Sequence, residues 1–133
     1  MMGYGILTHK EGKLIIVDGG NRGDASQLRK FIELHGNRVS AWFITHPHPD
    51  HVDALTAILE EPNPPVIDFI YTSLPDQAWF VKYESNPPKH LESFTAFRRA
   101  LDKSGLKNID IAIGDRIWID GVLFKILGIK NPE

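Results

Sequence analysis

The feature that most constrains the fold is a run of four apolar residues, Leu14-Ile15-Ile16-Val17, which stops at Asp18-Gly19-Gly20. Successive side chains of a strand point to opposite faces of its sheet, so a strand that is apolar throughout has to be covered on both faces. Such strands are typical of sheets that lie between other layers of structure. The Asp-Gly-Gly sequence is a strong turn signal and predicts where the strand ends.

Strand and helix signals alternate along the whole chain, and this order predicts one α/β domain over residues 1–133. Strands are expected at residues 5–8, 13–17, 39–45, 66–72 and 109–113, then a short one through Trp118 and one at 122–127, with the first two as a hairpin. Helices are expected to begin at Asp24, with Gln27 completing a capping box, near Val52, and at Pro88. The segment 75–89 is expected to be irregular, and its aromatic side chains either line a pocket or pack into a core or an interface.

Composition excludes several classes of protein. The chain has 133 residues, a formal net charge of −2 and no cysteine, so disulfides and thiolate ligands are impossible. The charge gives no support to a general affinity for nucleic acid. No apolar run reaches membrane-spanning length and no signal peptide is recognisable, which predicts a cytoplasmic protein without a membrane partner.

The segment His46-Pro47-His48-Pro49-Asp50-His51 directly follows a predicted strand. In extended backbone, residues two apart point the same way, so the first two imidazoles can grip one cation. Each proline restricts the residue before it to extended geometry, which holds both histidines ready for a ligand. Asp50 and His51 add a carboxylate and a third imidazole. A nitrogen and oxygen set of this kind suits zinc, and also iron, manganese or cobalt.

Simpler roles are open for several of these polar residues. Asp50 could cap the helix that follows it, alone or in addition to binding metal. Asp18 could be only a turn-forming residue before two glycines. His35, on the apolar face near the end of a helix, is expected to be either a packed histidine or a C-terminal one, and His90, at the start of another helix, is expected to be solvated.

The stretch Thr45–His51 resembles the HxHxDH signature of the metallo-β-lactamase superfamily, and Leu14–Gly20 resembles the strand ending in Asp-Gly-Gly that precedes it there. The order of elements over residues 13–60 is similar as well, and so is the turn at Gly114-Asp115. The resemblance implies an α/β fold of the αββα type, of which this chain supplies roughly the N-terminal αβ half. Within the superfamily, the segment THPHPDHVDAL that begins at Thr45 most resembles the hydrolase domain of bacterial DNA-uptake (competence) proteins.

The resemblance also implies a site. His46 and His48 would ligate a first divalent metal ion, and Asp50 and His51 a second, with zinc favoured and iron or manganese as alternatives. Asp50 would also be catalytic, by orienting or deprotonating the attacking water. Asp18 matches a carboxylate that steadies the metal-binding loop from behind the ligands. The implied function is a metal-dependent hydrolase, in which metal-bound hydroxide attacks an ester, amide or phosphodiester bond of a small-molecule substrate.

The chain departs from the family after the motif. The second half of the family fold supplies one more histidine for the first metal, a bridging aspartate and a last histidine. Here His90 lies in a different region, and Asp115 and Asp120 look like turn residues. We therefore expect a C-terminally incomplete domain whose isolated chain has weak activity or none. The alternatives are a non-catalytic metal-binding or dimerising half-domain and an accessory of DNA uptake or processing.

A lone half would also leave one face of its sheet bare, since the second half of the fold normally covers it. Large exposed apolar patches usually mark interfaces. We therefore expect that the chain is not a free monomer. A second copy in a homo-oligomer, a partner protein, or the remainder of a longer protein would supply the missing cover.

Overall fold

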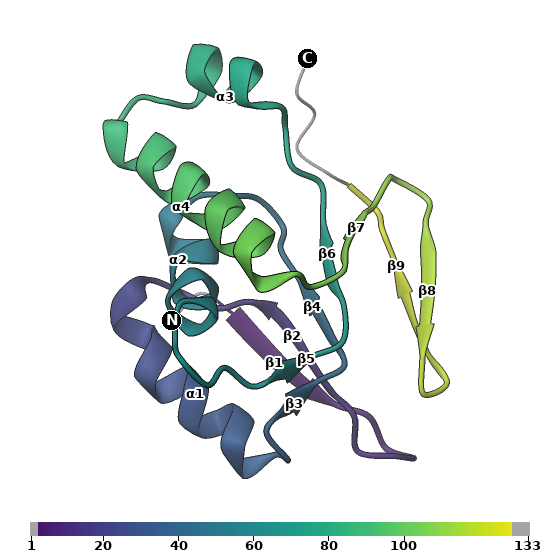
Figure 1. Ribbon diagram of the computed structural model, residues 1–133. Coiled ribbons are helices and arrows are strands. Elements are labelled where there is room, and N and C mark those ends of the chain that lie inside the picture. Colours follow the sequence, from purple (N-terminus) through teal and green to yellow (C-terminus); the bar gives the residue numbers. More distant parts are fainter. Residues whose placement is uncertain (1–2, 129–133) are drawn as a thin grey trace.

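A computed structural model of the protein describes residues 3–128 (Figure 1). Its largest sheet has five strands in the order β1-β2-β4-β6-β7. Their bounds are Gly3–Leu7 for β1, Leu14–Asp18 for β2, Ala41–Phe43 for β4, Ile70–Thr72 for β6 and Asn108–Asp110 for β7. β1 and β2 form the expected antiparallel hairpin, and every other neighbouring pair in this sheet is parallel. The mixed α/β fold predicted from the sequence is confirmed.

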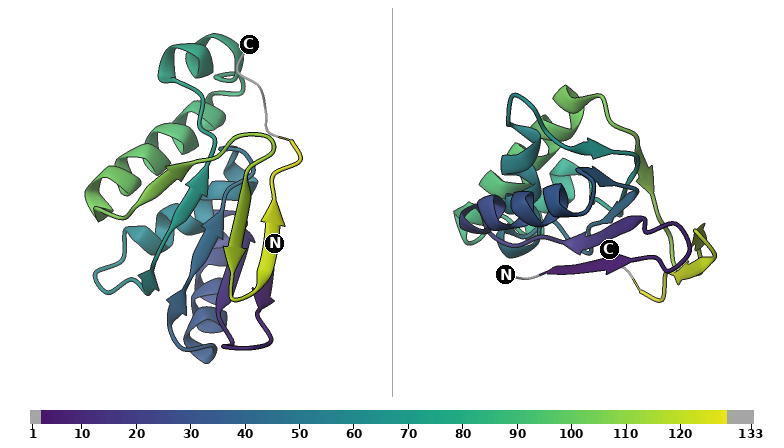
Figure 2. Two further views of the ribbon diagram at one scale, coloured as in Figure 1. Left: turned by 90° about the vertical axis from the view of Figure 1, so that its right-hand side faces the viewer. Right: turned by 90° about the horizontal axis from the view of Figure 1, so that it is seen from below.

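Three helices cover one face of this sheet: α1 (Ala25–Leu34), α2 (Pro49–Leu59) and α4 (Pro88–Ser104) (Figures 1 and 2). The main core lies between them and the sheet, where Trp42, Ile58 and Phe97 are completely buried. α4 begins at Pro88, as predicted, and ends at Gly105, whose φ of 67° is a left-handed cap that glycine adopts without strain. Among residues 3–128, no helix combines the length and apolar character needed to cross a bilayer.

A second hairpin, β8 (Arg116–Ile119) with β9 (Val122–Lys125), covers part of the opposite face of the sheet (Figure 2). Phe124 of β9 stacks on Phe43 of β4, with ring centroids 5.3 Å apart. Phe43 belongs to a second apolar cluster, which also contains the fully buried Ile15. The expectation that nothing in this chain covers the second face is therefore wrong. Residues of β8 and β9 pack on it, although they lie far from Phe43 and Ile15 in the sequence.

The tips of the two hairpins are joined. The backbone N–H of Glu11, in the β1–β2 turn, donates a hydrogen bond of 2.7 Å to Oδ2 of Asp120, in the β8–β9 turn. Asp120 has a left-handed φ of 48°, which fits the turn role predicted for it. Asp115 is also a turn residue, since its Oδ2 accepts from the N–H of Ala112 at 2.8 Å.

Several predicted bounds are wrong, each for a local reason. The segment 39–45 divides into β3 (Arg38–Val39) and β4, and the segment 66–72 into β5 (Val66–Ile67) and β6. β3 and β5 pair with each other in a small separate sheet. The segment expected to be irregular contains a helix, α3 (Gln77–Tyr83), because the Asp76 side chain accepts from the N–H of Trp79 and caps its first turn.

Asp24 does not cap α1 through its side chain, contrary to the predicted capping box. Its Oδ2 instead accepts from the N–H of Asn21 at 2.9 Å, within a short 3-10 helix, η1 (Arg22–Asp24), that precedes α1. α2 begins at Pro49, three residues earlier than expected, because proline is favoured at the first position of a helix. The early start places the last part of the histidine segment inside a helix.

Candidate metal centre

Asp18 is the last residue of β2 and has a left-handed φ of 59°, a conformation that aspartate and asparagine tolerate better than most residues. Its carboxylate is buried beneath the loop that follows β4. Oδ1 accepts from the backbone N–H of Thr45 at 2.9 Å, and Oδ2 accepts from the Thr45 hydroxyl at 2.8 Å. Its carbonyl oxygen accepts from Nε1 of Trp42 at 2.7 Å. Asp18 therefore anchors the start of the histidine loop through its carboxylate, which binds Thr45, and through its backbone carbonyl, which binds Trp42 of β4.

The histidine loop runs from Thr45 to His48, between β4 and α2. His48 is the residue before the first turn of α2 and is extended, with φ −87° and ψ 157°, as expected before Pro49. The ring centroid of His46 lies 4.7 Å from that of His48 and 3.9 Å from that of His51. The three imidazoles therefore form one cluster at the C-terminal end of β4.

Asp50 and His51 lie in the first turn of α2. Asp50 is not the N-cap residue, which is His48, so the simple capping role considered for Asp50 is wrong. Oδ2 of Asp50 lies 3.6 Å from Nε2 of His51. Two ligand atoms on a tetrahedral zinc ion with bonds of about 2.0–2.1 Å are separated by about 3.4 Å. The spacing of these two donors therefore suits a shared divalent ion.

The other ring nitrogen of His51 is bound to Asp18. Nδ1 of His51 lies 2.8 Å from Oδ2 of Asp18, and the two side chains are only 12% and 8% exposed. A carboxylate on one nitrogen of an imidazole fixes the ring orientation and leaves the opposite nitrogen for a metal. This is the arrangement expected of a residue that steadies a metal ligand from behind.

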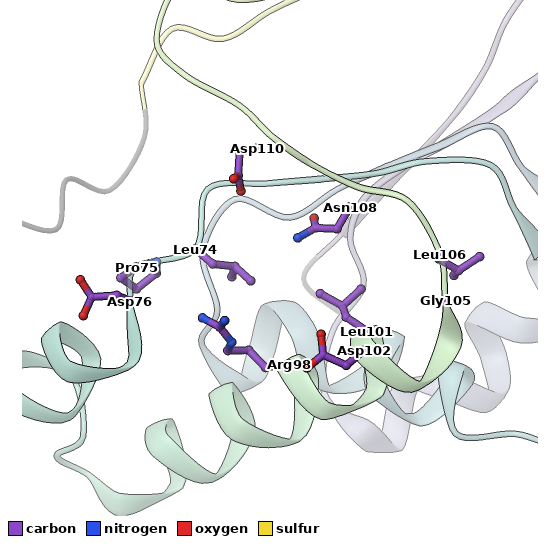
Figure 3. A pocket seen from close by; sticks show the side chains of 10 residues that line it. All are labelled: Leu74, Pro75, Asp76, Arg98, Leu101, Asp102, Gly105, Leu106, Asn108 and Asp110. Atoms are coloured by element: carbon purple, nitrogen blue, oxygen red, sulfur yellow. The ribbon is translucent and has the colours of Figure 1, made fainter.

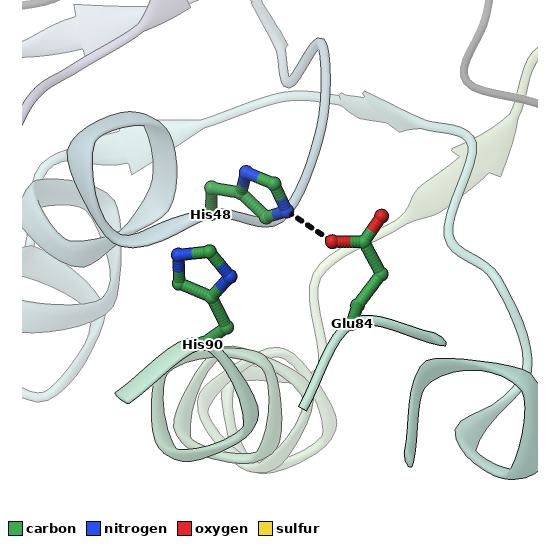
Figure 4. A group of neighbouring side chains, drawn as sticks. All are labelled: His48, Glu84 and His90. Carbon is green, nitrogen blue, oxygen red and sulfur yellow. Dashed lines mark hydrogen bonds and ion pairs between the residues drawn. The ribbon is translucent and has the colours of Figure 1, made fainter. Parts of the chain in front are cut away.

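Two residues outside the predicted motif, Glu84 and His90, contact His48 (Figure 4). Nε2 of His48 lies 2.7 Å from Oε2 of Glu84, which follows the last residue of α3. The ring of His90, in the first turn of α4, stacks on that of His48 with centroids 4.3 Å apart and planes inclined by 21°. His90 was expected to be solvated and remote from the motif, and both expectations are wrong.

No spacing signal in the sequence could have found this cluster, because α3 and α4 bring its members together only in the folded chain. One donor atom from each of His48, Glu84 and His90 lies within 4.8 Å of the others. These three residues are therefore a second set that could in principle hold an ion.

The aromatic residues of α3 are divided between two roles. Phe80 is buried and stacks on Phe94 of α4, with centroids 4.1 Å apart and nearly parallel planes, so it is a core residue. Trp79 lines a small hollow beside His48 and Glu84. Tyr83 is largely exposed and contacts Trp79. Of the two roles considered for this segment, core packing is confirmed for Phe80.

A hollow of about 530 Å³ lies away from the histidines (Figure 3). It lies along α4 and β7, and its charged side chains include Arg98, Asp102 and Asp110. His35 is also remote from the motif. It is the exposed C-cap residue of α1, which agrees with the C-terminal role considered for it, and it makes an edge contact with Phe31.

A comparison with known protein families finds a match. The family described as the metallo-beta-lactamase superfamily matches residues 4–81, which is more than half of the chain and includes Asp18 and the whole histidine segment. Glu84 and His90 lie beyond the matched stretch. No curated protein matches the chain.

Proposed function

Since this chain belongs to the metallo-beta-lactamase superfamily, we propose that it is a metal-dependent hydrolase whose metal ions are held by His46, His48, Asp50 and His51. The observation that carries the proposal is the convergence of these side chains at the C-terminal end of β4. The ring centroid of His46 lies 4.7 Å from that of His48 and 3.9 Å from that of His51, and the Asp50 carboxylate lies 3.6 Å from Nε2 of His51.

The donor set favours zinc, with iron or manganese as alternatives. It contains imidazole nitrogens and carboxylate oxygens and no sulfur, a combination that these ions share. One or two ions would be held, depending on how the four residues are divided. When bound, a divalent ion would polarise the bond to be broken and make a water molecule acidic enough to attack it near neutral pH.

The remaining roles, proton transfer and positioning of the metal ligands, would belong to residues of the chain itself. The side chain of Asp50 is 46% exposed, so it can reach a water molecule on the open side of the cluster and accept its proton. Asp18 and Thr45 would keep His51 and the histidine loop from moving as the substrate binds. The bond classes that suit such a site are esters, amides and phosphodiesters.

Metal content tests the first half of the proposal. The double variant His46→Ala/His48→Ala should lose its bound zinc after purification in zinc-containing buffer, as measured by elemental analysis. The core beneath α1, α2 and α4 should keep the variant folded, because it does not depend on the loop. The matched control is His9→Ala/His35→Ala, which removes two exposed histidines. Equal zinc in the two double variants and the parent would refute the proposed ligands.

Hydrolysis tests the second half. The zinc-loaded chain would be assayed with p-nitrophenyl acetate, bis(p-nitrophenyl) phosphate and a chromogenic β-lactam. We expect slow turnover of at least one substrate, and Asp50→Asn should reduce that turnover by about 10²–10⁴-fold, the range for loss of a general base. Turnover that is absent from the zinc-loaded chain with every substrate would favour a non-catalytic metal-binding module.

A further inference from the structure

Two histidines of the motif carry a carboxylate on one ring nitrogen. In His51 the nitrogen is Nδ1 and the carboxylate belongs to Asp18, at 2.8 Å. In His48 the nitrogen is Nε2 and the carboxylate belongs to Glu84, at 2.7 Å. The two pairs are alike in length and in burial, but they engage opposite nitrogens. The first carboxylate lies inside the stretch that matches the family, and the second lies outside it.

We propose that Glu84 is a positioning residue for the metal centre. It holds His48 in the tautomer with the proton on Nε2, so that Nδ1 is the nitrogen presented to a metal ion. This inference rests on the proposed function, because it assumes that His48 is a ligand. The inference adds that Glu84 determines which nitrogen of His48 is free to bind the metal ion. α3 contributes by placing Glu84, the residue that follows its last turn, beside His48.

Burial gives the His48–Glu84 contact its strength. The two side chains are 19% and 14% exposed, so little water competes for either partner. A hydrogen bond to a charged acceptor in such surroundings is stronger than one in water. A neutral imidazole has one N–H and one lone pair, so an N–H committed to Glu84 leaves the lone pair on Nδ1.

His90 restrains the same ring in a second way. Its imidazole lies nearly parallel to that of His48, with an inclination of 21° and a centroid separation of 4.3 Å. The stack resists rotation of the His48 ring out of its plane, while the bond to Glu84 resists rotation within it. Figure 4 shows the two residues approaching His48 from separate segments of the chain. Together they fix an imidazole that otherwise stands on a short loop.

Direct coordination of an ion by His48, Glu84 and His90 is the competing interpretation, since their donor atoms all lie within 4.8 Å of one another. Two features of the geometry argue against it. The 2.7 Å separation of Nε2 and Oε2 suits a shared proton and is shorter than the roughly 3.4 Å between two ligands of one tetrahedral zinc ion. The lone pairs of an imidazole lie in the ring plane, so two stacked rings cannot both point them at one ion.

The tautomer of His48 is the direct test, and long-range ¹H–¹⁵N NMR of the full chain labelled with ¹⁵N measures it. In the metal-free wild type we expect His48 to be protonated on Nε2 and not on Nδ1. Addition of Zn²⁺ should move the Nδ1 resonance to the position of a metal-bound nitrogen while Nε2 keeps its proton. A proton on Nδ1 in the metal-free chain, or loss of the Nε2 proton when zinc binds, would overturn the proposal.

Zinc affinity provides a second readout, measured by competition with a chromophoric chelator. Glu84→Ala should weaken zinc binding by about 10–100-fold, the range for removal of the hydrogen-bond partner of a ligand histidine. Glu84→Gln should cause a smaller loss, because its amide oxygen still accepts from Nε2–H. The matched control is Glu92→Ala, which removes an exposed glutamate of α4. Circular dichroism of each variant shows whether it is folded.

The outcomes separate this inference from the function on which it rests. Zinc binding by the wild type that Glu84→Ala leaves unchanged would overturn the role of Glu84 alone. Zinc binding that persists in His46→Ala but disappears in both Glu84→Gln and His90→Ala would overturn it in favour of direct coordination. A wild type that binds no zinc overturns the proposed function. In that case the tautomer of His48 in the metal-free chain tests whether Glu84 orients His48. A proton on Nε2 supports this role of Glu84, and a proton on Nδ1 overturns it.

Discussion

Nδ1 of His51 lies 2.8 Å from Oδ2 of Asp18, although 33 residues separate the two in the chain. The same carboxylate accepts from both the backbone and the side chain of Thr45. One buried group at the end of β2 therefore connects the start of the histidine loop with the first turn of α2. Loss of its charge would loosen both at once.

We expect Asp18→Asn to weaken zinc affinity by about 10–100-fold while the protein stays folded. Asparagine accepts the left-handed φ of 59° at this position, so the backbone has no reason to change. Its amide offers only one acceptor in place of a carboxylate that serves Thr45 and His51. The measurement is a zinc titration monitored with a competing chelator.

Asp120→Asn is the control for this substitution, because it makes the same chemical change at another left-handed position, in the distant β8–β9 turn. Its zinc affinity should equal that of the parent. If Asp18→Asn instead unfolds the chain, and the folded remainder binds zinc normally, Asp18 is a turn residue without a role at the centre.

Removal of metal should lower the stability of the chain without unfolding it. A ligand present at a hundredfold excess over its dissociation constant stabilises the folded state by about 2.7 kcal/mol. For a chain of this size, that corresponds to a rise in Tm on the order of 10 °C. Differential scanning calorimetry with zinc and with a chelator should show this difference. An unfolded protein in chelator would mean that the core under α1, α2 and α4 does not suffice.

The C-terminal hairpin should contribute measurably to stability. Phe124→Ala removes the ring that stacks on Phe43, and we expect it to cost about 2–3 kcal/mol, slightly less than for a fully buried phenylalanine. Trp118→Ala is the matched control on the outer side of the same hairpin. Its side chain is 65% exposed, so its loss should change the unfolding free energy by less than about 0.5 kcal/mol. Urea denaturation measures both, and equal values would show that the hairpin does not pack on the sheet in solution.

Asp120 should make stability depend on pH in the acid range. The hydrogen bond from the Thr8 side chain, aided by the Glu11 N–H, lowers the pKa of the Asp120 carboxyl in the folded chain. The ionised form therefore favours folding. Its contribution is present above the unfolded pKa of about 3.9 and is lost as pH falls through the lower folded value. The difference in unfolding free energy between the parent and Asp120→Asn should be larger at pH 6 than at pH 2.5. A difference that is constant over this range would contradict the role of the charge.

Much of the fold could be predicted because its signals are local. The apolar run at 14–17, the turn at Glu11-Gly12 and the helix from Pro88 to Gly105 each depend on residues a few positions apart. α3 has a local signal in its cap residue Asp76, but its seven residues were missed because they also depend on Phe80 stacking against Phe94 in another helix. The cover of the second sheet face was missed for the same reason, since Glu11 and Asp120 are 109 positions apart.

The candidate site divides in the same way. The spacing of His46 and His48 around two prolines predicts neighbouring imidazoles, and the structure has them. Glu84 has no sequence relationship to His48 and reaches it only through α3. The subfamily resemblance, the cytoplasmic location and self-association stay predictions, although the hairpin weakens the argument for the last. Sedimentation velocity at micromolar concentration tests the oligomeric state.

The link between Glu11 and Asp120 also has a consequence for the synthesis of the protein. A ribosome adds roughly 10 residues per second, and domains form from the N-terminal end as the chain emerges. The strands β2, β4 and β6 leave the ribosome well before β8 and β9. Until the hairpin forms, the side chains of Ile15 and Phe43 are therefore exposed to water on the face that the hairpin later covers. During those seconds the nascent chain exposes apolar surface of the kind that favours aggregation. That exposure ends when the β8–β9 hairpin folds back over strands synthesised several seconds earlier.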